Sequence, residues 1–254
     1  MRDILDAVAS GDLSPAEAEA ELTGYASVDA GRFDAAREQR RGVPEAILAD
    51  GKMADEIAEL AETAVATAGR AIVTRIDDGA ANTVAKRLSA DVPDATVRWD
   101  DRAQTLVAHA PEFEPPRLDS TVGIVTGGTS DAEAAGEAAT IASEMGARVD
   151  LVEDVGVAGI ARVLDRIERL RESDVLIVAA GREGALPTVV AGLVDVPVIG
   201  LPVSSGYGLG GEGEAALAGM LQSCTVISAV NVDAGFVAGA QAGLIARAVA
   251  GGQS

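Results

Sequence analysis

Five short, almost uninterrupted apolar runs alternate with helical patterns in the second half of the chain. Strands that are buried on both faces have this character, and strands separated by helices form parallel sheets. The expected strands are Val122 to Thr126, Arg148 to Val152, Val175 to Ala180, Val198 to Leu201 and Val226 to Val230. The expected helices are Asp131 to Met145, Ala158 to Arg171, Leu186 to Val194, Glu212 to Ser223 and Phe236 to Val249. The sequence therefore predicts a three-layer α/β/α domain with a parallel sheet over residues 120–254.

A smaller α/β domain is expected before it, over residues 1–110. Its helical patterns cover Asp3 to Ser10, Pro15 to Gly24, Met53 to Ala68 and Ala80 to Ala90. Its strand patterns cover Ala46 to Asp50, Ala71 to Ile76, Thr96 to Trp99 and Gln104 to Ala108. Residues 111–119 form the expected linker, because three prolines and alternating charges suit neither a helix nor a central strand.

The charge balance of the chain is strongly acidic, with 40 acidic against 20 basic residues and a net charge of -20. We interpret this as an adaptation to a salt-rich cytoplasm, where counter-ions screen the self-repulsion. The charge argues against nucleic acid as a partner, since phosphate backbones need a basic face. The first residues lack the apolar core of a signal peptide, and no apolar run is long enough to span a membrane. We therefore expect a cytoplasmic protein without a membrane partner.

Glycine-rich loops follow three of the expected strands, and the carboxyl ends of parallel strands are where open α/β sheets bind ligands. The candidate loop residues are Gly127, Gly128, Thr129, Ser130 and Asp131, then Gly181, Glu183 and Gly184, then Ser204, Ser205 and Gly206. Free amides and hydroxyls at a helix start predict an anion site in the first loop. Helix capping by Ser130 or Asp131 explains that loop nearly as well.

The single cysteine, Cys224, stands between a predicted helix and the last predicted strand. A lone cysteine is usually a small buried apolar residue, and one cysteine excludes an intramolecular disulfide framework. The polar turn Asn231 to Gly235 follows the strand, and we expect it to lie with Cys224 at one sheet edge. Residues 33–45, if helical, place Arg37, Arg40 and Arg41 on one side, where they either bind an anion or form structural ion pairs.

The second half resembles the aminoimidazole ribonucleotide (AIR) carboxylase fold, which is flavodoxin-like, on four segments. These are Gly123 to Asp131, Ala180 to Pro187, Val196 to Pro202 and Asn231 to Gly239. That family carries a histidine where this chain has Glu183, and the only histidine here is His109, before the linker. The whole chain is similar to the carboxylase/hydrolase family of nickel-pincer nucleotide biosynthesis. Its hallmarks appear as Arg37-x-x-Arg40-x-Gly42-x-Pro44-Glu45, Gly51-Lys52, Thr74-Arg75, Glu183 to Pro187 and Ser223-Cys224.

This resemblance implies a reaction of nicotinic acid adenine dinucleotide with CO₂ and water. It makes Cys224 the nucleophile and Glu183 the proton acceptor or ring-positioning group, with Asp233 as the second candidate. The residues expected to bind the substrate are the loop residues above together with Asn231, Arg37, Arg40, Lys52 and Arg75. The sequence contains no cluster of His and Cys residues that would suggest a protein-bound metal. We expect no tightly bound cofactor. If the reaction uses Mg²⁺, we expect the ion to arrive bound to the substrate pyrophosphate. The family further implies a homo-oligomer, commonly an octamer.

Two other functions stay open at this point. The first is an AIR carboxylase or mutase, against which the missing histidine and the unexplained first half both count. The second is a nucleotide-binding regulator without catalysis. A reactive Cys224 thiol that substrate protects would separate an enzyme from such a regulator.

Overall fold

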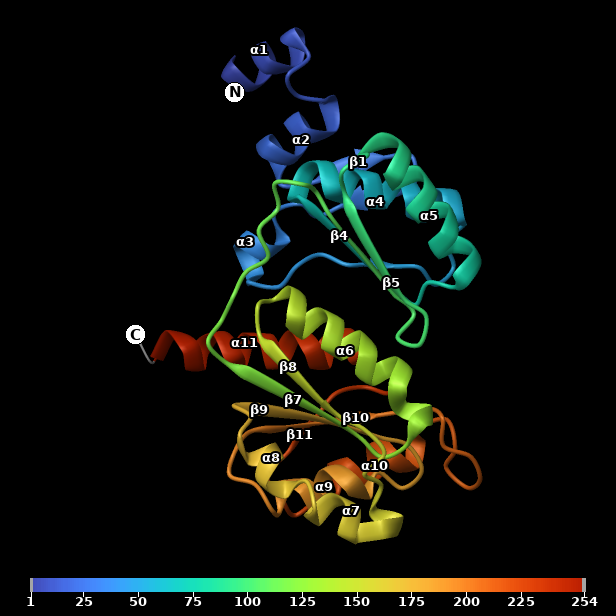
Figure 1. Ribbon diagram of the computed structural model, residues 1–254. Helices are drawn as coiled ribbons and strands as arrows, with labels where there is room; N and C mark the ends of the chain where they lie inside the picture. The colour runs from blue at the N-terminus through green and yellow to red at the C-terminus, as the bar shows by residue number, and fades with distance from the viewer. Residues whose placement is uncertain (1, 253–254) are drawn as a thin grey trace. The chain divides into compact units, whose positions relative to one another are not determined.

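The computed structural model describes residues 2–252, and the chain divides into two compact units between Glu114 and Pro115 (Figure 1). This boundary falls within the segment expected to be the linker. None of the described helices is long and apolar enough to cross a membrane.

The second unit contains the five-stranded parallel sheet that the sequence predicts. Its strands are β7 (Thr121–Thr126), β8 (Arg148–Val152), β9 (Val175–Ala180), β10 (Val198–Pro202) and β11 (Ser228–Ala229). They lie in the order β11-β10-β9-β7-β8, which is the flavodoxin-like order. Every residue of β9 is buried, as its continuous apolar run predicts. The edge strand β11 is shorter than expected, since Val226 is 94% exposed and only β10 pairs with it.

Helices cover both faces of this sheet, which confirms the three-layer architecture (Figure 1). One face carries α6 (Ala132–Glu144) and α11 (Gly235–Gly252). The other carries α7 (Ile160–Leu164), α8 (Ile167–Arg171), α9 (Ala185–Ala191) and α10 (Glu214–Leu221). The single helix expected over residues 158–171 is wrong. It is divided into the turn η2 (Val157–Gly159), α7 and α8, because the Arg166 amide donates three residues back, to Val163, and tightens the chain there.

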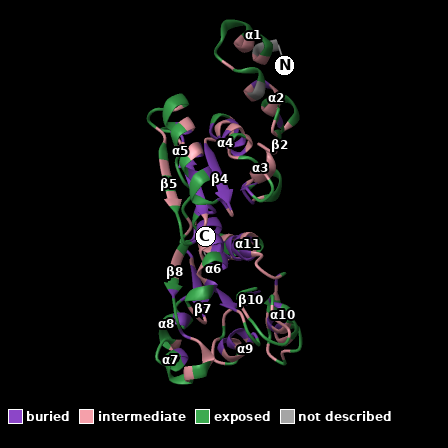
Figure 2. Ribbon diagram, turned by 90° about the vertical axis from the view of Figure 1, so that its right-hand side faces the viewer, coloured by how far each residue is buried: buried purple, intermediate pink, exposed green. Residues whose placement is uncertain are grey.

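The first unit is built on a four-stranded sheet in the order β3-β4-β6-β5. The strands are β3 (Ile47–Leu48), β4 (Arg70–Thr74), β5 (Thr96–Asp100) and β6 (Thr105–His109), and only β3 and β4 run parallel. The helices α4 (Ala54–Ala68) and α5 (Asp78–Asp91) supply much of the core against it. Figure 2 shows β4 as a buried strand, and all five of its residues are buried.

Two short helices, α1 (Arg2–Ser10) and α2 (Pro15–Thr23), precede a hairpin that the sequence pattern did not reveal. The hairpin consists of β1 (Ala26–Val28) and β2 (Gly31–Phe33). The helix considered over residues 33–45 is shorter than that range, because Phe33 ends β2 as a buried core residue, but it does contain Arg37, Arg40 and Arg41. Only α3 (Arg37–Arg41) is helical there, and it ends at Gly42, whose φ is 68°.

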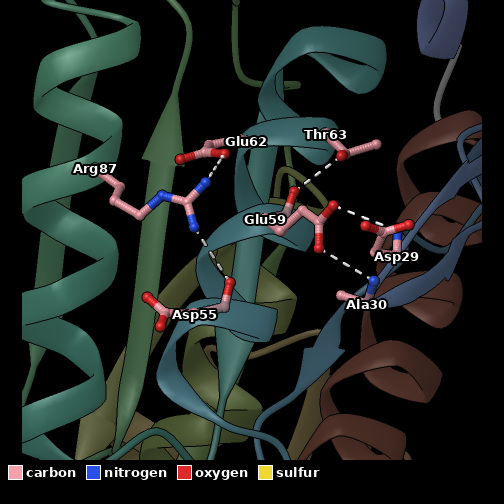
Figure 3. A network of polar contacts seen from close by, with 7 residues as sticks. All are labelled: Asp29, Ala30, Asp55, Glu59, Glu62, Thr63 and Arg87. Carbon is pink, nitrogen blue, oxygen red and sulfur yellow. Dashed lines mark hydrogen bonds and ion pairs between the residues drawn. The ribbon is translucent and has the colours of Figure 1, made fainter.

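A polar network joins the hairpin turn to α4 (Figure 3). The amides of Asp29 and Ala30 donate to the two carboxylate oxygens of Glu59, at 3.3 and 3.1 Å. On the neighbouring side of α4, Arg87 from α5 pairs with Glu62 at 2.7 Å. A carboxylate that accepts two backbone donors is held in place by charge-assisted bonds, so the hairpin is anchored to the unit's core.

Candidate active site

A cleft of about 400 Å³ opens at the carboxyl ends of β7 and β9. The chain leaves these adjacent strands in opposite directions, which makes this the switch point of the sheet. Four loops line the cleft, drawn from residues 127–131, 156–162, 180–186 and 205–207. The cleft therefore lies where ligands bind in flavodoxin-like folds.

Asp131 is the buried acid of the cleft, with only 4% of its surface exposed. Its Oδ2 accepts from the amide of Gly128 at 2.8 Å, and its Oδ1 accepts from the hydroxyl of Ser205 at 3.3 Å. Burial raises the pKa of the Asp131 carboxyl, while bonds from Gly128, Ser205 and other donors oppose that rise. The Gly128 amide was expected to cradle a phosphate. In the structure its hydrogen bond goes to the carboxylate of Asp131 instead.

We expect Asp131→Asn to change how stability depends on pH. A folded-state pKa above the unfolded one means that the folded protein binds the proton more tightly, so wild-type stability falls as pH rises from the ordinary aspartate value through the raised one. The stability of wild type minus that of Asp131→Asn should therefore grow on acidification through this window. Urea melts at a series of pH values test this, with Asp94→Asn, at an exposed position, as the control. A difference that shrinks on acidification would contradict it.

Glu183 lies exposed in the loop that enters α9, and it lines the cleft as expected. The neighbouring Arg182 stacks on the ring of Tyr207, with 4.0 Å between guanidinium carbon and ring centroid. Gly206 permits this approach of two loops, because a Cβ there would stand 2.6 Å from the Arg182 amide nitrogen. The Arg182–Tyr207 stack, a cation–π contact, forms part of the cleft lining.

Cys224 is exposed and lies in the bend between the end of α10 and the start of β11. Its neighbours Ser223 and Thr225 share a hydrogen bond of 2.7 Å, and Thr188 of α9 donates to Ser223 at 3.0 Å. Because Cys224 precedes a parallel strand, it lies at the amino edge of the sheet. The expectation that it shares an edge with the turn Asn231 to Gly235 is wrong, since that turn follows β11 at the carboxyl edge.

Asp233 and Asn231 organise the carboxyl edge without lining the cleft. Asp233 Oδ1 accepts from the amide of Ser204 at 2.9 Å, and its own amide donates to the carbonyl of Pro202. Asn231 Oδ1 accepts from the amide of Val232. The expected residues that the cleft does bring together are Gly127, Gly128, Ser130, Asp131, Gly181, Glu183 and Ser205. Thr129, Gly184, Ser204 and Gly206 lie in the same loops but outside its lining.

Two family comparisons match different parts of the chain. The AIR carboxylase family matches residues 121–254, more than half of the chain, and the LarB/PurE-like N-terminal domain matches residues 25–110. The chain belongs to the LarB-like family, whose second domain is AIR carboxylase-like. An uncharacterized protein of Methanocaldococcus jannaschii is 38% identical over 97% of both chains.

This LarB-like protein is also similar to two solved PurE structures. Treponema denticola PurE has 20% identity and a TM-score of 0.40, covering 51% of this chain and 78% of its own. A variant of a second PurE protein from that organism has 17% identity and a TM-score of 0.40, covering 52% and 91%.

The cations expected to bind substrate lie in the first unit of this LarB-like chain. Arg37 pairs with Glu45 at 2.6 Å and Arg40 with Asp34 at 2.6 Å. A separate pocket of about 410 Å³ is lined by Lys52, which donates to the carbonyl of Leu48, and by Arg75, which pairs with Asp50 at 3.2 Å. Arg37 and Arg40 line a different pocket of the same unit, so the structure divides these four cations between two pockets.

One cleft cation escaped the sequence reasoning. Arg162 lines the cleft from α7 and pairs with Asp154 at 3.0 Å, beside Gly156 and Val157. These residues follow the strand expected over 148–152, so the rule that pointed to the other loops also applies to this one. This loop was not identified from the sequence because it lacks the clustered hydroxyl residues that marked the other loops. Within residues 2–252, no group of three or more His, Cys, Asp or Glu side chains could hold a metal ion.

Proposed function

We propose that this protein converts nicotinic acid adenine dinucleotide, CO₂ and water into pyridinium-3,5-biscarboxylic acid mononucleotide and AMP. Membership of a PurE-like carboxylase family makes carbon dioxide chemistry the starting point. The observation that carries the finer proposal is the exposed thiol of Cys224, the only cysteine of the chain. A solvent-accessible thiol is available as a nucleophile, whereas a buried structural cysteine is inert.

A thiolate solves the main chemical problem of this reaction. A pyridinium ring is electron-poor and does not attack CO₂. Addition of the Cys224 thiolate to the ring forms a carbon–sulfur bond and turns C5 into an enamine-type nucleophile, whose electron pair forms the new bond to CO₂. A base then takes the C5 proton, the carbon–sulfur bond breaks, and the thiolate leaves with its electron pair as the ring regains aromaticity. Water cleaves the phosphoanhydride in a separate step that releases AMP.

Glu183 is the residue we assign to proton transfer or ring positioning, because its carboxylate stands exposed in the cleft. Asp233 is less suited, since one of its oxygens accepts the Ser204 amide. The cleft offers glycine backbone at Gly127, Gly128 and Gly181, beside which a flat ring fits closely. Arg162 and Arg182 supply positive charge for a phosphate there.

Cys224 and Glu183 lie at opposite edges of one sheet, and this separation is a reason to expect a site shared between two copies of the chain. β10 has five residues, so the two edges are separated by roughly 15 Å. Cys224 is not among the residues that line the cleft of its own chain. We propose that the protein acts as a homo-oligomer in which Cys224 of one copy completes the cleft of another, and the resemblance implies an octamer.

Mixing two inactive variants tests this shared site. Cys224→Ala should be inactive alone and Glu183→Gln strongly impaired, and unfolding and refolding the two together should restore activity above the rate of either. If the two residues come from different copies, about one site in four of a random 1:1 mixture carries both intact residues. The measurement is carboxylation rate per chain, with Cys224→Ala refolded alone as the control. If hybrids that are verified to contain both variants show no recovery of carboxylation, both residues of a site come from the same copy of the chain.

The proposed reaction itself is tested by incubating the purified protein with nicotinic acid adenine dinucleotide and ¹³C-bicarbonate. Mass spectrometry should show the labelled dicarboxylated mononucleotide and AMP, and quenched protein should carry the pyridine adduct on the Cys224 peptide. Turnover of AIR instead would support the AIR carboxylase alternative. That alternative is disfavoured because the cleft carries Glu183 where the AIR carboxylase family carries a histidine. The histidine of this chain, His109, lies on β6 of the first unit, 4.9 Å from the ring of Phe113. Dinucleotide binding without any product would indicate the regulator.

A further inference from the structure

Four arginines converge on one pocket of the first unit, which is unexpected in a chain of net charge -20. The pocket has a volume of about 570 Å³ and is lined by Arg32, Arg37, Arg40 and Arg41. Its volume falls within the range of about 300–1,000 Å³ that small-molecule sites occupy. We call these residues, with Tyr25, Asp34, Val43 and Glu45, the arginine pocket.

The charges of the arginine pocket do not cancel. Glu45 and Asp34 neutralise Arg37 and Arg40 through ion pairs of 2.6 Å. In the described part of the chain, no carboxylate pairs with Arg32 or Arg41. Four positive and two negative side chains leave an excess of two positive charges, which matches the charge of a phosphate monoester near neutral pH. A bound dianion would therefore neutralise the pocket, and guanidinium groups are suited to binding phosphate oxygens.

The remaining lining of the arginine pocket suits a planar ring. Tyr25 is 41% exposed, and the guanidinium of Arg40 lies 5.4 Å from its ring centroid. Val43 adds a buried apolar surface. Aromatic and guanidinium faces stack with nucleobases, as they do in single-stranded nucleic-acid sites.

The pocket is also well supported. Tyr25 directly precedes β1 and Arg32 lies in β2, and the turn of this hairpin is held by Glu59 (Figure 3). Arg41 lies on α3, whose Glu38 pairs with the buried Arg70 at 2.7 Å. These contacts hold the two sides of the pocket to the core of the first unit, and preorganised side chains lose less freedom when a ligand binds.

We propose that the arginine pocket binds a nucleoside monophosphate, with the phosphate on Arg32 and Arg41 and the base beside Tyr25. This site belongs to the first unit and does not rest on the proposed reaction. It explains why the first unit carries clustered arginines in an otherwise acidic protein.

Calorimetric titration of the full-length protein with AMP tests the proposal. Arg32→Ala and Arg41→Ala should each weaken AMP binding by about ten- to a hundredfold, the effect of losing one charge-assisted contact. Arg37 and Arg40 are left intact, because their removal would strand Glu45 and Asp34. Arg166→Ala, at an exposed position of the second unit, removes the same charge and should leave the affinity unchanged.

Further ligands and variants separate the parts of the proposal. Inorganic phosphate should bind more weakly than AMP with the same dependence on Arg32 and Arg41, and adenosine should bind weakest. If the alanine variants fail to fold, Arg32→Lys and Arg41→Lys keep the charge and should bind AMP with intermediate affinity. Unchanged AMP affinity in a folded Arg32→Ala/Arg41→Ala double variant would overturn the site. Phosphate binding as tightly as AMP would overturn the role of the base. Carboxylation is measured separately, so a failed reaction and a failed pocket give different results.

Discussion

Cys224→Ala is expected to abolish carboxylation while the protein still folds and binds the dinucleotide. The methyl group cannot add to the pyridinium ring, so turnover should fall by about 10⁴-fold or more, as when a covalent nucleophile is removed. The thiol is exposed, so its loss should change the free energy of unfolding by no more than about 0.5 kcal/mol. Product formation from ¹³C-bicarbonate measures the first effect, and a urea melt measures the second.

A matched control for this variant is Ser223→Ala, one residue away. It removes a hydroxyl that accepts from Thr188 and hydrogen-bonds with Thr225, but leaves the thiol in place. We expect it to keep measurable carboxylation and to form the adduct. Wild-type turnover in Cys224→Ala would remove the covalent mechanism from consideration.

Glu183→Gln is expected to slow the chemical step by about 10²-fold or more with little change in substrate affinity. The amide keeps the shape of the carboxylate but does not accept a proton near neutral pH. The effect should therefore appear in kcat rather than in KM. Single-turnover kinetics with the labelled substrate separate this step from binding.

Glu214→Gln, on the first turn of α10, is the control for the change of charge. It should leave kcat unaltered. If kcat is also unaltered in Glu183→Gln, the proton acceptor would instead be Asp233 or water. Asp233→Asn discriminates between these two. Because Asp233 Oδ1 also accepts from the Ser204 amide, a melting curve is measured together with the rate.

The sequence by itself determined the parallel sheet and most of its elements. Apolar runs such as Val175 to Ala180 are readable because a strand buried on both faces needs apolar side chains at every position. The loops after β7, β9 and β10 were identified by the same local reasoning, and Glu183 does line the cleft. The family resemblance rested on short motifs that are contiguous in the chain.

Only the tertiary structure decided which of these loops meet and what their groups contact. Asp131 is bonded by Ser205, 74 positions away, and such a contact depends on the order of strands rather than on local pattern. Cys224 and the polar turn Asn231 to Gly235 are near one another in sequence. The direction of β11, which runs between them, nevertheless places Cys224 at the amino edge of the sheet. The arginine pocket likewise depends on the β1–β2 hairpin, whose three-residue strands are too short to show a clear period of two. Periodicity reports which face of an element is buried, while the partners across that face are set by packing between distant segments.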